Sequence, residues 1–152
     1  MVNKAMVGRS GPRFEMAVER GKIREFARAT GSSSPEYLEG PDPVVPPTFL
    51  TSVVFWQPAE AADLYRAIDI DLARLLHGEQ EFIFTGAPPR AGTTLHARTV
   101  VEEIYEKEGK RGGVMTFVVM RTDFTDDGGA VVAQSRSTAI ETGRPPAAAQ
   151  GA

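Results

Sequence analysis

Three long runs in the C-terminal half of this 152-residue chain alternate apolar and polar residues, and turn-forming segments separate them. The runs cover residues 94–106, 114–124 and 130–142. Alternation with a period of two predicts strands that have one buried and one exposed face. The Gly-rich loop at 106–113 and the Asp-Asp-Gly-Gly turn at 126–129 are typical of hairpins. The sequence therefore predicts an antiparallel meander.

Helices and one short strand are predicted before this meander. Residues 14–18 alternate like a strand, and residues 19–30 place their apolar side chains on one helical face. The apolar run at 48–57 fits both a strand and a helix, because its period does not distinguish them. Residues 59–66 are good helix formers, and residues 81–84 start the strand signals. Helices that precede a run of strands indicate the α+β class.

The composition narrows the class of protein. The length favours one domain, which we expect at 10–143, between a flexible segment at 1–9 and a disordered tail at 144–152. Seventeen scattered basic residues and a formal net charge of −3 argue against nucleic acid as a partner. The absence of cysteine excludes disulfides and thiolate chemistry, and it fits a cytoplasmic protein. No apolar run is long enough to span a bilayer, so no membrane partner is expected.

One family shares several of these features. Residues 77–82 read His-Gly-Glu-Gln-Glu-Phe, and a Pro-Arg-Ala-Gly turn at 89–92 and the meander follow them. With Pro-Thr-Phe at 47–49, this resembles the non-catalytic, N-terminal half of MaoC-like, hydratase-2 type dehydratases over residues 10–143. The resemblance implies a hot-dog fold, an antiparallel sheet wrapped around a central helix, which residues 48–57 would form. It also implies that two such domains pair side by side and bind an acyl-CoA or acyl-carrier-protein thioester between them.

The resemblance fails at the family's catalytic positions. Catalytic members carry an Asp, an Asn-Pro pair and a His shortly after the first helix. The matching positions here are Ser32, Ser34-Pro35 and Tyr37, so only the proline is kept. Hydration of an enoyl thioester requires groups that exchange protons near neutral pH, which suits Asp and His. A serine hydroxyl does not ionise usefully there, and an ordinary tyrosine has a pKa of about 10. We therefore expect no catalytic residue in this segment.

His77 is the candidate that could restore acid/base chemistry, together with Glu79. The alternative, which we favour, is a loop anchor at the entrance of the strand, because the family keeps this residue type in its inert half. His96 shares a strand face with charged residues, so a solvated or interface position is the expected one. The two histidines lack a metal-ligand spacing, and we expect neither a metal nor another cofactor.

The remaining carboxylates give weaker candidates. Asp69 and Asp71 could act as a pair, but their alternation with apolar residues predicts a short extended piece with its acids in water. Asp126 and Asp127 are turn formers. Glu36, next to the lost histidine position, has no evident partner for a role as a base.

Apolar and aromatic residues around the predicted central helix have two interpretations. The hydrophobic core explains most of them, whereas the resemblance implies that some line a tunnel for the acyl tail. Trp56 and Tyr65 suit a tunnel best, because each combines an apolar body with a polar tip. Arg90 could meet a phosphate of the CoA or the carrier, although a surface arginine is the commoner explanation. The substrate-binding candidates are Phe49, Phe55, Trp56, Tyr65, Leu76 and Arg90.

The sequence thus predicts a non-catalytic, acyl-tail-binding subunit of a heteromeric enoyl thioester hydratase or (R)-3-hydroxyacyl dehydratase, a lyase of fatty-acid or steroid side-chain metabolism. Its expected partner is a second MaoC-like chain that carries the Asp/His pair, in a heterodimer or a dimer of heterodimers. A homodimeric hot-dog protein that binds acyl thioesters without turnover is an alternative of a different class. A thioesterase is a third; it needs a carboxylate, and only Glu36 or Glu79 is available. The acyl group and the carrier stay open.

Overall fold

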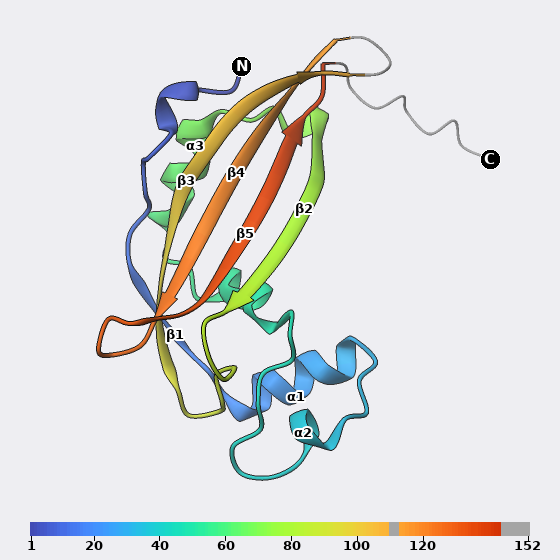
Figure 1. Cartoon of the computed structure of the whole chain (residues 1–152), viewed down its shortest axis with the longest axis vertical. Coiled ribbons are helices and arrows are strands. Elements are labelled where there is room, and N and C mark those ends of the chain that lie inside the picture. Colours follow the sequence, from blue (N-terminus) through green and yellow to red (C-terminus); the bar gives the residue numbers. More distant parts are fainter. Residues whose placement is uncertain (110–112, 144–152) are drawn as a thin grey trace, which may run out of the picture.

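A computed structural model of the protein describes residues 1–109 and 113–143. The predicted tail at 144–152 and residues 110–112 of the predicted hairpin loop lie outside the described residues. The helical elements are η1 (Lys4–Met6), α1 (Arg20–Ala29), α2 (Pro35–Leu38), η2 (Phe49–Phe55), α3 (Ala61–Ile68) and η3 (Leu72–Arg74), where η denotes a 3₁₀ helix. The strands are β1 (Phe14–Ala17), β2 (Leu75–Phe84), β3 (Thr94–Glu108), β4 (Val114–Thr125) and β5 (Val131–Glu141). They form one antiparallel sheet in the order β1-β3-β4-β5-β2 (Figure 1).

The predicted meander is confirmed as β3, β4 and β5, which pair in sequence order. Alternate residues of β3 (Leu95, Ala97, Thr99 and Val101) are buried, as the pattern predicts. They face α3 and η2, so one face of the sheet carries the core. Figure 1 shows α3 behind the sheet and no helix of the described chain in front of it.

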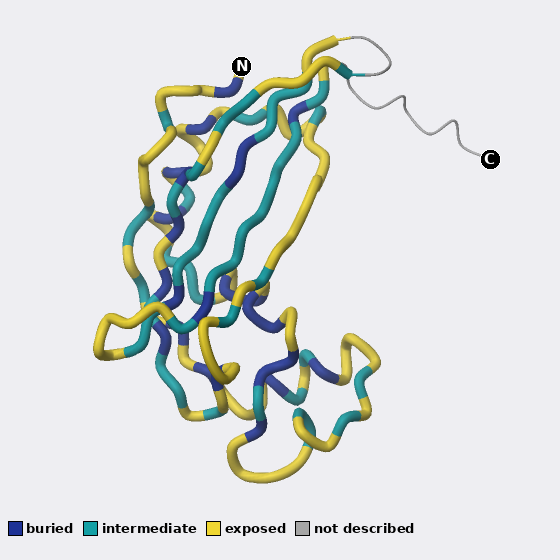
Figure 2. Tube along the Cα trace, viewed as in Figure 1, coloured by how far each residue is buried: buried dark blue, intermediate teal, exposed yellow. Residues whose placement is uncertain are grey.

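The strand that the sequence predicts at 81–84 is longer in the structure, where it is β2. β2 begins at Leu75 and pairs along β5, from Leu75 opposite Glu141 to Phe84 opposite Ala133. Its first seven residues are all exposed, so they show no alternation that could reveal a strand. β2 is also the edge of the sheet, and Figure 2 shows it exposed along most of its length.

The predicted central helix at 48–57 is only a short 3₁₀ helix, η2. It buries Phe49, Leu50, Ser52 and Val53, and the hydroxyl of Ser52 donates to the carbonyl of Phe49 at 2.6 Å. Pro58, which has no N–H to donate, follows η2, and the regular helix α3 starts only at Ala61. Two short helices divided at a proline therefore occupy the place of one long helix.

The N-terminal segment at 1–9, predicted to be flexible, instead packs onto the rest of the chain. Val2 is buried beside Ile68 and Val101. The backbone N–H of Asn3 donates to the carbonyl of Ile68 at 2.9 Å, and that of Gly8 donates to the carbonyl of Val101 at 2.8 Å. These backbone bonds depend on neighbours distant in sequence, which the local pattern does not contain.

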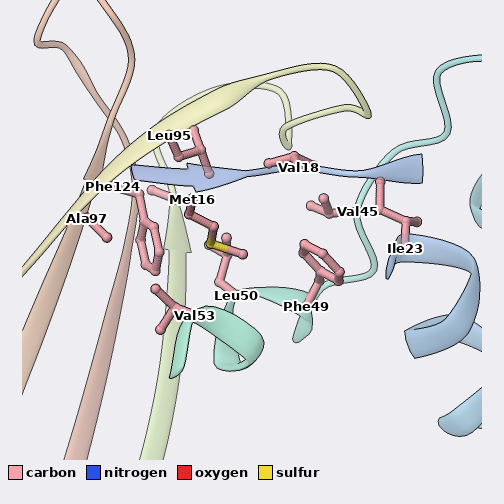
Figure 3. Close-up of a cluster of buried hydrophobic side chains, with 11 residues drawn as sticks. Met16, Val18, Ile23, Val45, Phe49, Leu50, Val53, Leu95, Ala97 and Phe124 are labelled. Carbon is pink, nitrogen blue, oxygen red and sulfur yellow. The ribbon is translucent and has the colours of Figure 1, made fainter. Parts of the chain in front are cut away.

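The main core lies where β1, β3 and β4 meet α1 and η2 (Figure 3). Phe49 is fully buried there and meets the ring of Phe26 edge to face, with ring centroids 5.6 Å apart. A second cluster packs Leu64 and Ile68 of α3 against Val101 and Val118 of the sheet. Both clusters lie on the same face of the sheet; the first fixes η2 and α1 relative to the strands, and the second fixes α3.

Gly78, the glycine of the His-Gly-Glu-Gln motif, lies in a bulge of β2. The pairing register of β2 with β5 shifts between His77 and Glu79. A Cβ atom at Gly78 would lie 2.7 Å from Cδ1 of Ile140 and 3.2 Å from the carbonyl oxygen of Thr138. The motif glycine is therefore explained by close approach to β5.

We expect Gly78→Ala to lower the free energy of unfolding by about 1–3 kcal/mol, the usual cost of an overpacked site. Ile140→Val removes Cδ1, so a double-mutant cycle should give a favourable coupling of at least about 0.5 kcal/mol. Urea unfolding of the four proteins measures both values. Gly86→Ala is the matched control, because a Cβ there meets nothing within 4 Å. Equal stability of the two alanine variants would contradict this explanation.

Candidate functional site

The segment that matches the family's catalytic positions follows α1 and includes α2. Gly31 ends α1 with a positive φ of 74°. The Ser32 side-chain oxygen accepts a hydrogen bond from the backbone N–H of Ser34 at 3.3 Å. Pro35 begins α2, and Tyr37 packs against the main core. Ser32 and Tyr37 therefore have structural contacts of their own.

His77 does not lie in a loop before the strand. It is the third residue of β2, its side chain is exposed, and that side chain has no hydrogen-bond partner within residues 1–109 and 113–143. Glu79 is exposed farther along the same strand. His96 is more enclosed than predicted: its imidazole is only 16% exposed, and its Nε2 lies 3.0 Å from the Asp127 carboxylate. This contact ties β3 to the hairpin turn.

Asp69 and Asp71, which the sequence predicts in a short extended piece with both acids in water, have two different structural roles. Asp69 is exposed and ends α3 in a left-handed conformation. Asp71 does not simply face water, because its carboxylate accepts hydrogen bonds from Arg74 at 2.9 Å and from the backbone N–H of Ala73 at 3.0 Å. The Arg74 hydrogen bond is the main cause that lowers the pKa of Asp71. Arg74 also reaches the buried carboxylate of Glu141 at 2.7 Å, which fastens the start of β2 to the end of β5.

A second ion-pair cluster lies on the open face of the sheet. Glu102 accepts from Arg121 at 3.0 Å and from Arg136 at 2.7 Å. Arg121 also donates to Asp123 at 2.9 Å, and this bond is the main cause that raises the pKa of Arg121. The sequence does not reveal this cluster, because its members come from β3, β4 and β5. The groups with shifted pKa values thus belong to structural ion pairs.

An apolar groove of about 320 Å³ lies between α1 and η2. Three of the predicted substrate-binding residues, Phe49, Phe55 and Trp56, line it from η2 and its C-terminal end. The other lining residues are Lys22, Glu25, Phe26 and Ala29 from α1, and Ser52 from η2. The α1 residues were not predicted as site residues, although their spacing already placed Phe26 on the apolar side of that helix.

The other three predicted binding residues do not line this groove. The Tyr65 hydroxyl accepts a hydrogen bond from the side-chain amide of Gln57 at 3.3 Å. Leu76 lies on β2 and pairs with Ile140. Arg90 donates to the carbonyl oxygen of Asp42 at 3.0 Å, as a surface arginine does. None of these three side chains lines the groove.

The rim of the groove is charged, whereas its walls are aromatic. At the rim, the Lys22 ammonium lies 3.1 Å from the Glu25 carboxylate, and both side chains are more than half exposed. The walls are aromatic, from Phe26, Phe49 and Trp56. Such a groove suits an alkyl chain, because burying each methylene contributes about 0.8 kcal/mol. It contains no histidine, so it offers binding surface and not an acid/base pair.

The described residues form neither a cluster of metal ligands nor a membrane-spanning helix. No group of three or more histidine, aspartate or glutamate side chains there is arranged to hold a metal ion. Among the same residues, no helix has the length and apolar character needed to cross a membrane.

Comparison with curated proteins shows the family. The model of the FAS1-like, dehydratase domain region family matches residues 5–135. A UPF0336 protein of Streptomyces coelicolor is 33% identical over 117 residues, which cover 71% of this chain and 77% of the relative. A UPF0336 protein of Clavibacter michiganensis subsp. michiganensis is 33% identical over 153 residues, covering 93% and 97%.

Solved structures confirm the predicted α+β hot-dog fold. A chain of the C-terminally truncated HadBC complex, a 3R-hydroxyacyl-ACP dehydratase of Mycobacterium tuberculosis, is 26% identical with a TM-score of 0.71, covering 89% of this chain and 96% of that one. A MaoC-like dehydratase is 23% identical with a TM-score of 0.74. The match covers 91% of this chain and 42% of the dehydratase. This chain thus corresponds to less than half of that longer protein. The protein described here belongs to the FAS1-like dehydratase-region family and has the hot-dog fold of the MaoC-like dehydratases.

Proposed function

We propose that this chain is the non-catalytic, acyl-tail-binding subunit of a heteromeric enoyl thioester hydratase or (R)-3-hydroxyacyl-thioester dehydratase. The observation that carries this proposal is the segment after α1, which has Ser32, Ser34 and Tyr37 where catalytic relatives need Asp, Asn and His. Dehydration removes a proton from C2 and a hydroxide from C3 of the acyl chain, and the released groups form water. That step needs a proton acceptor and a proton donor near neutral pH. A second chain must supply them.

The groove between α1 and η2 is the proposed site for the acyl tail. Its aromatic walls and its lack of an acid/base pair fit binding without chemistry. Phe82 and Phe84, at the end of β2, pack against the core cluster that contains Phe49. The end of β2 and the groove therefore share one core cluster.

That edge is the proposed docking site of the partner. β2 has a strand beside it on one side only, so the backbone along its other side can pair with a strand of another chain. Exposed apolar side chains frame it, which water disfavours and a partner would cover. They are Leu72, Leu75, Leu76 and Ile83, which lie on β2 or just before it. The likeness to a chain of a two-component dehydratase complex supports a partner of the same fold.

The proposed substrates are acyl thioesters, and the proposed location is the cytoplasm, which the absence of cysteine supports. A thioesterase is less well supported. Glu36 lies exposed on α2 and Glu79 lies exposed on β2, and neither lines the groove.

Co-expression with a MaoC-like chain that carries an intact Asp/His pair tests the proposal. We expect a stable complex that hydrates an enoyl-CoA, whereas this chain alone should show no activity above the uncatalysed reaction. Static light scattering gives the stoichiometry, and loss of absorbance of the enoyl thioester gives the rate. Activity of this chain alone that His77→Ala abolishes would refute the proposal. A well-behaved, inactive homodimer that binds the thioester and ignores the second chain would instead establish the binding-protein alternative.

A further inference from the structure

One face of the sheet is covered by no helix of the described chain (Figure 1), and an apolar row crosses it. Four side chains form this row, one from each of four neighbouring strands: Tyr105, Phe117, Ile140 and Leu76. Each is the pairing partner of the next, in the strand order β3, β4, β5 and β2. The rings of Tyr105 and Phe117 stack with their centroids 4.8 Å apart, and Leu76 is 45% exposed. We call these four residues the outer stripe.

The outer stripe faces away from the core. Tyr105 borders the same hollow as Arg136, whose ion pair with Glu102 lies on the open face. Ile140 points the same way, because successive side chains of a strand alternate and its neighbour Ala139 packs against a core cluster. No residue of the stripe belongs to either core cluster of the described chain. An antiparallel sheet normally turns polar side chains to water, so an apolar row on the open face indicates a surface that another molecule covers.

Different side chains flank the outer stripe on its two sides. On β3, Lys107 lies two residues beyond the stripe and Glu103 lies two residues before it, and both are exposed. The Lys107 ammonium lies 5.0 Å and 5.2 Å from the centroids of the two stacked rings. Neither Lys107 nor Glu103 has an ion-pair partner within residues 1–109 and 113–143. On β4, Met115 and Val119 flank the stripe in the same way, and Val119 lines the hollow, whose volume is about 140 Å³.

A second copy of this chain is complementary to these flanks. A twofold axis along the outer stripe exchanges its two sides and keeps each strand opposite itself, so Lys107 of one copy meets Glu103 of the other. The same rotation carries Met115 over Val119 and its hollow, which a flexible methionine side chain can fill. Facing sheets lie about 10 Å apart, a gap that their side chains occupy. We propose that the open faces of two copies of this chain pack together along the outer stripe.

This contact differs from the surfaces that the proposed function uses, and the inference does not depend on that function. The groove lies between α1 and η2, which pack on the opposite face of the sheet. The outer stripe ends at Leu76 on the edge strand β2, so a strand added beside β2 lengthens the open face and does not cover it. With the catalytic chain present, the expected assembly therefore contains two copies of each chain.

Charge reversal tests the contact, and sedimentation equilibrium measures how strongly two copies of this chain pair. The protein is the complex with the catalytic chain, or this chain alone if no such complex forms. Lys107→Glu and Glu103→Lys should each weaken pairing about tenfold or more, because each change brings like charges together twice in one dimer. The double variant should restore pairing to within about threefold of the wild type. The two residues are four positions or about 13 Å apart on one strand and form no ion pair within a copy, so this restoration requires a second copy.

Arg9→Glu and Glu15→Lys are the matched controls, since both residues are exposed, lie outside the stripe and its flanks, and give the same changes of charge. Both controls should pair like the wild type. A wild type with one copy per particle, a dimer that ignores the single reversals, equal losses in the controls, or losses that the double variant does not restore would each overturn the inference. An active complex with one copy of each chain would overturn this inference alone. Charge-dependent pairing in a complex without hydratase activity would refute the proposed function alone.

Discussion

Ala29→Phe should lower the kcat/KM of the proposed complex for a long-chain acyl thioester while leaving that for a short-chain one almost unchanged. Ala29 lies on α1 and lines the groove of about 320 Å³, so a phenyl ring there would fill part of the proposed acyl-tail site. Excluding about four methylenes at about 0.8 kcal/mol each removes roughly 3 kcal/mol of binding. This corresponds to a loss of about a hundredfold in kcat/KM for a dodecenoyl thioester. A crotonyl thioester has no such tail, so we expect a change within about twofold.

The measurement compares both substrates for the wild-type complex and the variant. Ala67→Phe on α3 is the matched control, because it adds the same ring at an exposed helical position outside the groove. Light scattering should show that both variants still bind the catalytic chain. An equal loss on both substrates would indicate damaged assembly, and no loss on dodecenoyl thioester would exclude the groove as the tail site.

Phe49→Ala should lower the free energy of unfolding by about 3–5 kcal/mol, whereas Phe55→Ala should change it by less than about 0.5 kcal/mol. Both residues belong to η2, but Phe49 is fully buried and Phe55 is 82% exposed. Removing the Phe49 ring leaves a cavity in the core and deletes its edge-to-face contact with Phe26. Removing the Phe55 ring leaves no cavity.

The same substitution in one element gives a clean comparison. Chemical denaturation can be followed by the fluorescence of Trp56, the single tryptophan, which lies next to η2. Phe49→Ala should lower Tm by about 10 °C or more. We expect Phe55→Ala to weaken partner or substrate binding, since Phe55 lines the groove at the protein surface. Similar stability losses in the two variants would show that η2 does not pack as described.

The parts of the fold that the sequence predicts are those with a repeating pattern. In β3, the alternation from Leu95 to Val101 marks a buried face, and in α1 Ile23 and Ala27 share a buried side. The pattern fails at β2, whose first seven residues are exposed, because pairing with β5 alone defines that part of the strand. It also fails at η2, where a run of apolar residues carries no period that separates a 3₁₀ helix from a regular one.

The sequence predicts only those lining residues of the groove that are neighbours along the chain. Phe55 and Trp56 are neighbours in sequence, so one prediction found both. The sequence did not predict Phe26 and Ala29 as site residues, because they meet η2 only in the folded chain, across about twenty residues of sequence. Tyr65 was placed in the site on proximity along the chain, but it bonds Gln57 and lies outside the groove. The roles of all these residues stay predictions.

The one-sided pairing of β2 has a consequence for production of the protein in the cell. Its ten residues offer main-chain donors and acceptors that any extended peptide can satisfy. The proposed partner would cover these groups, so a copy without that partner should aggregate or be degraded more readily than an assembled copy. Expression of this chain alone should therefore give a lower soluble yield than co-expression with the proposed partner.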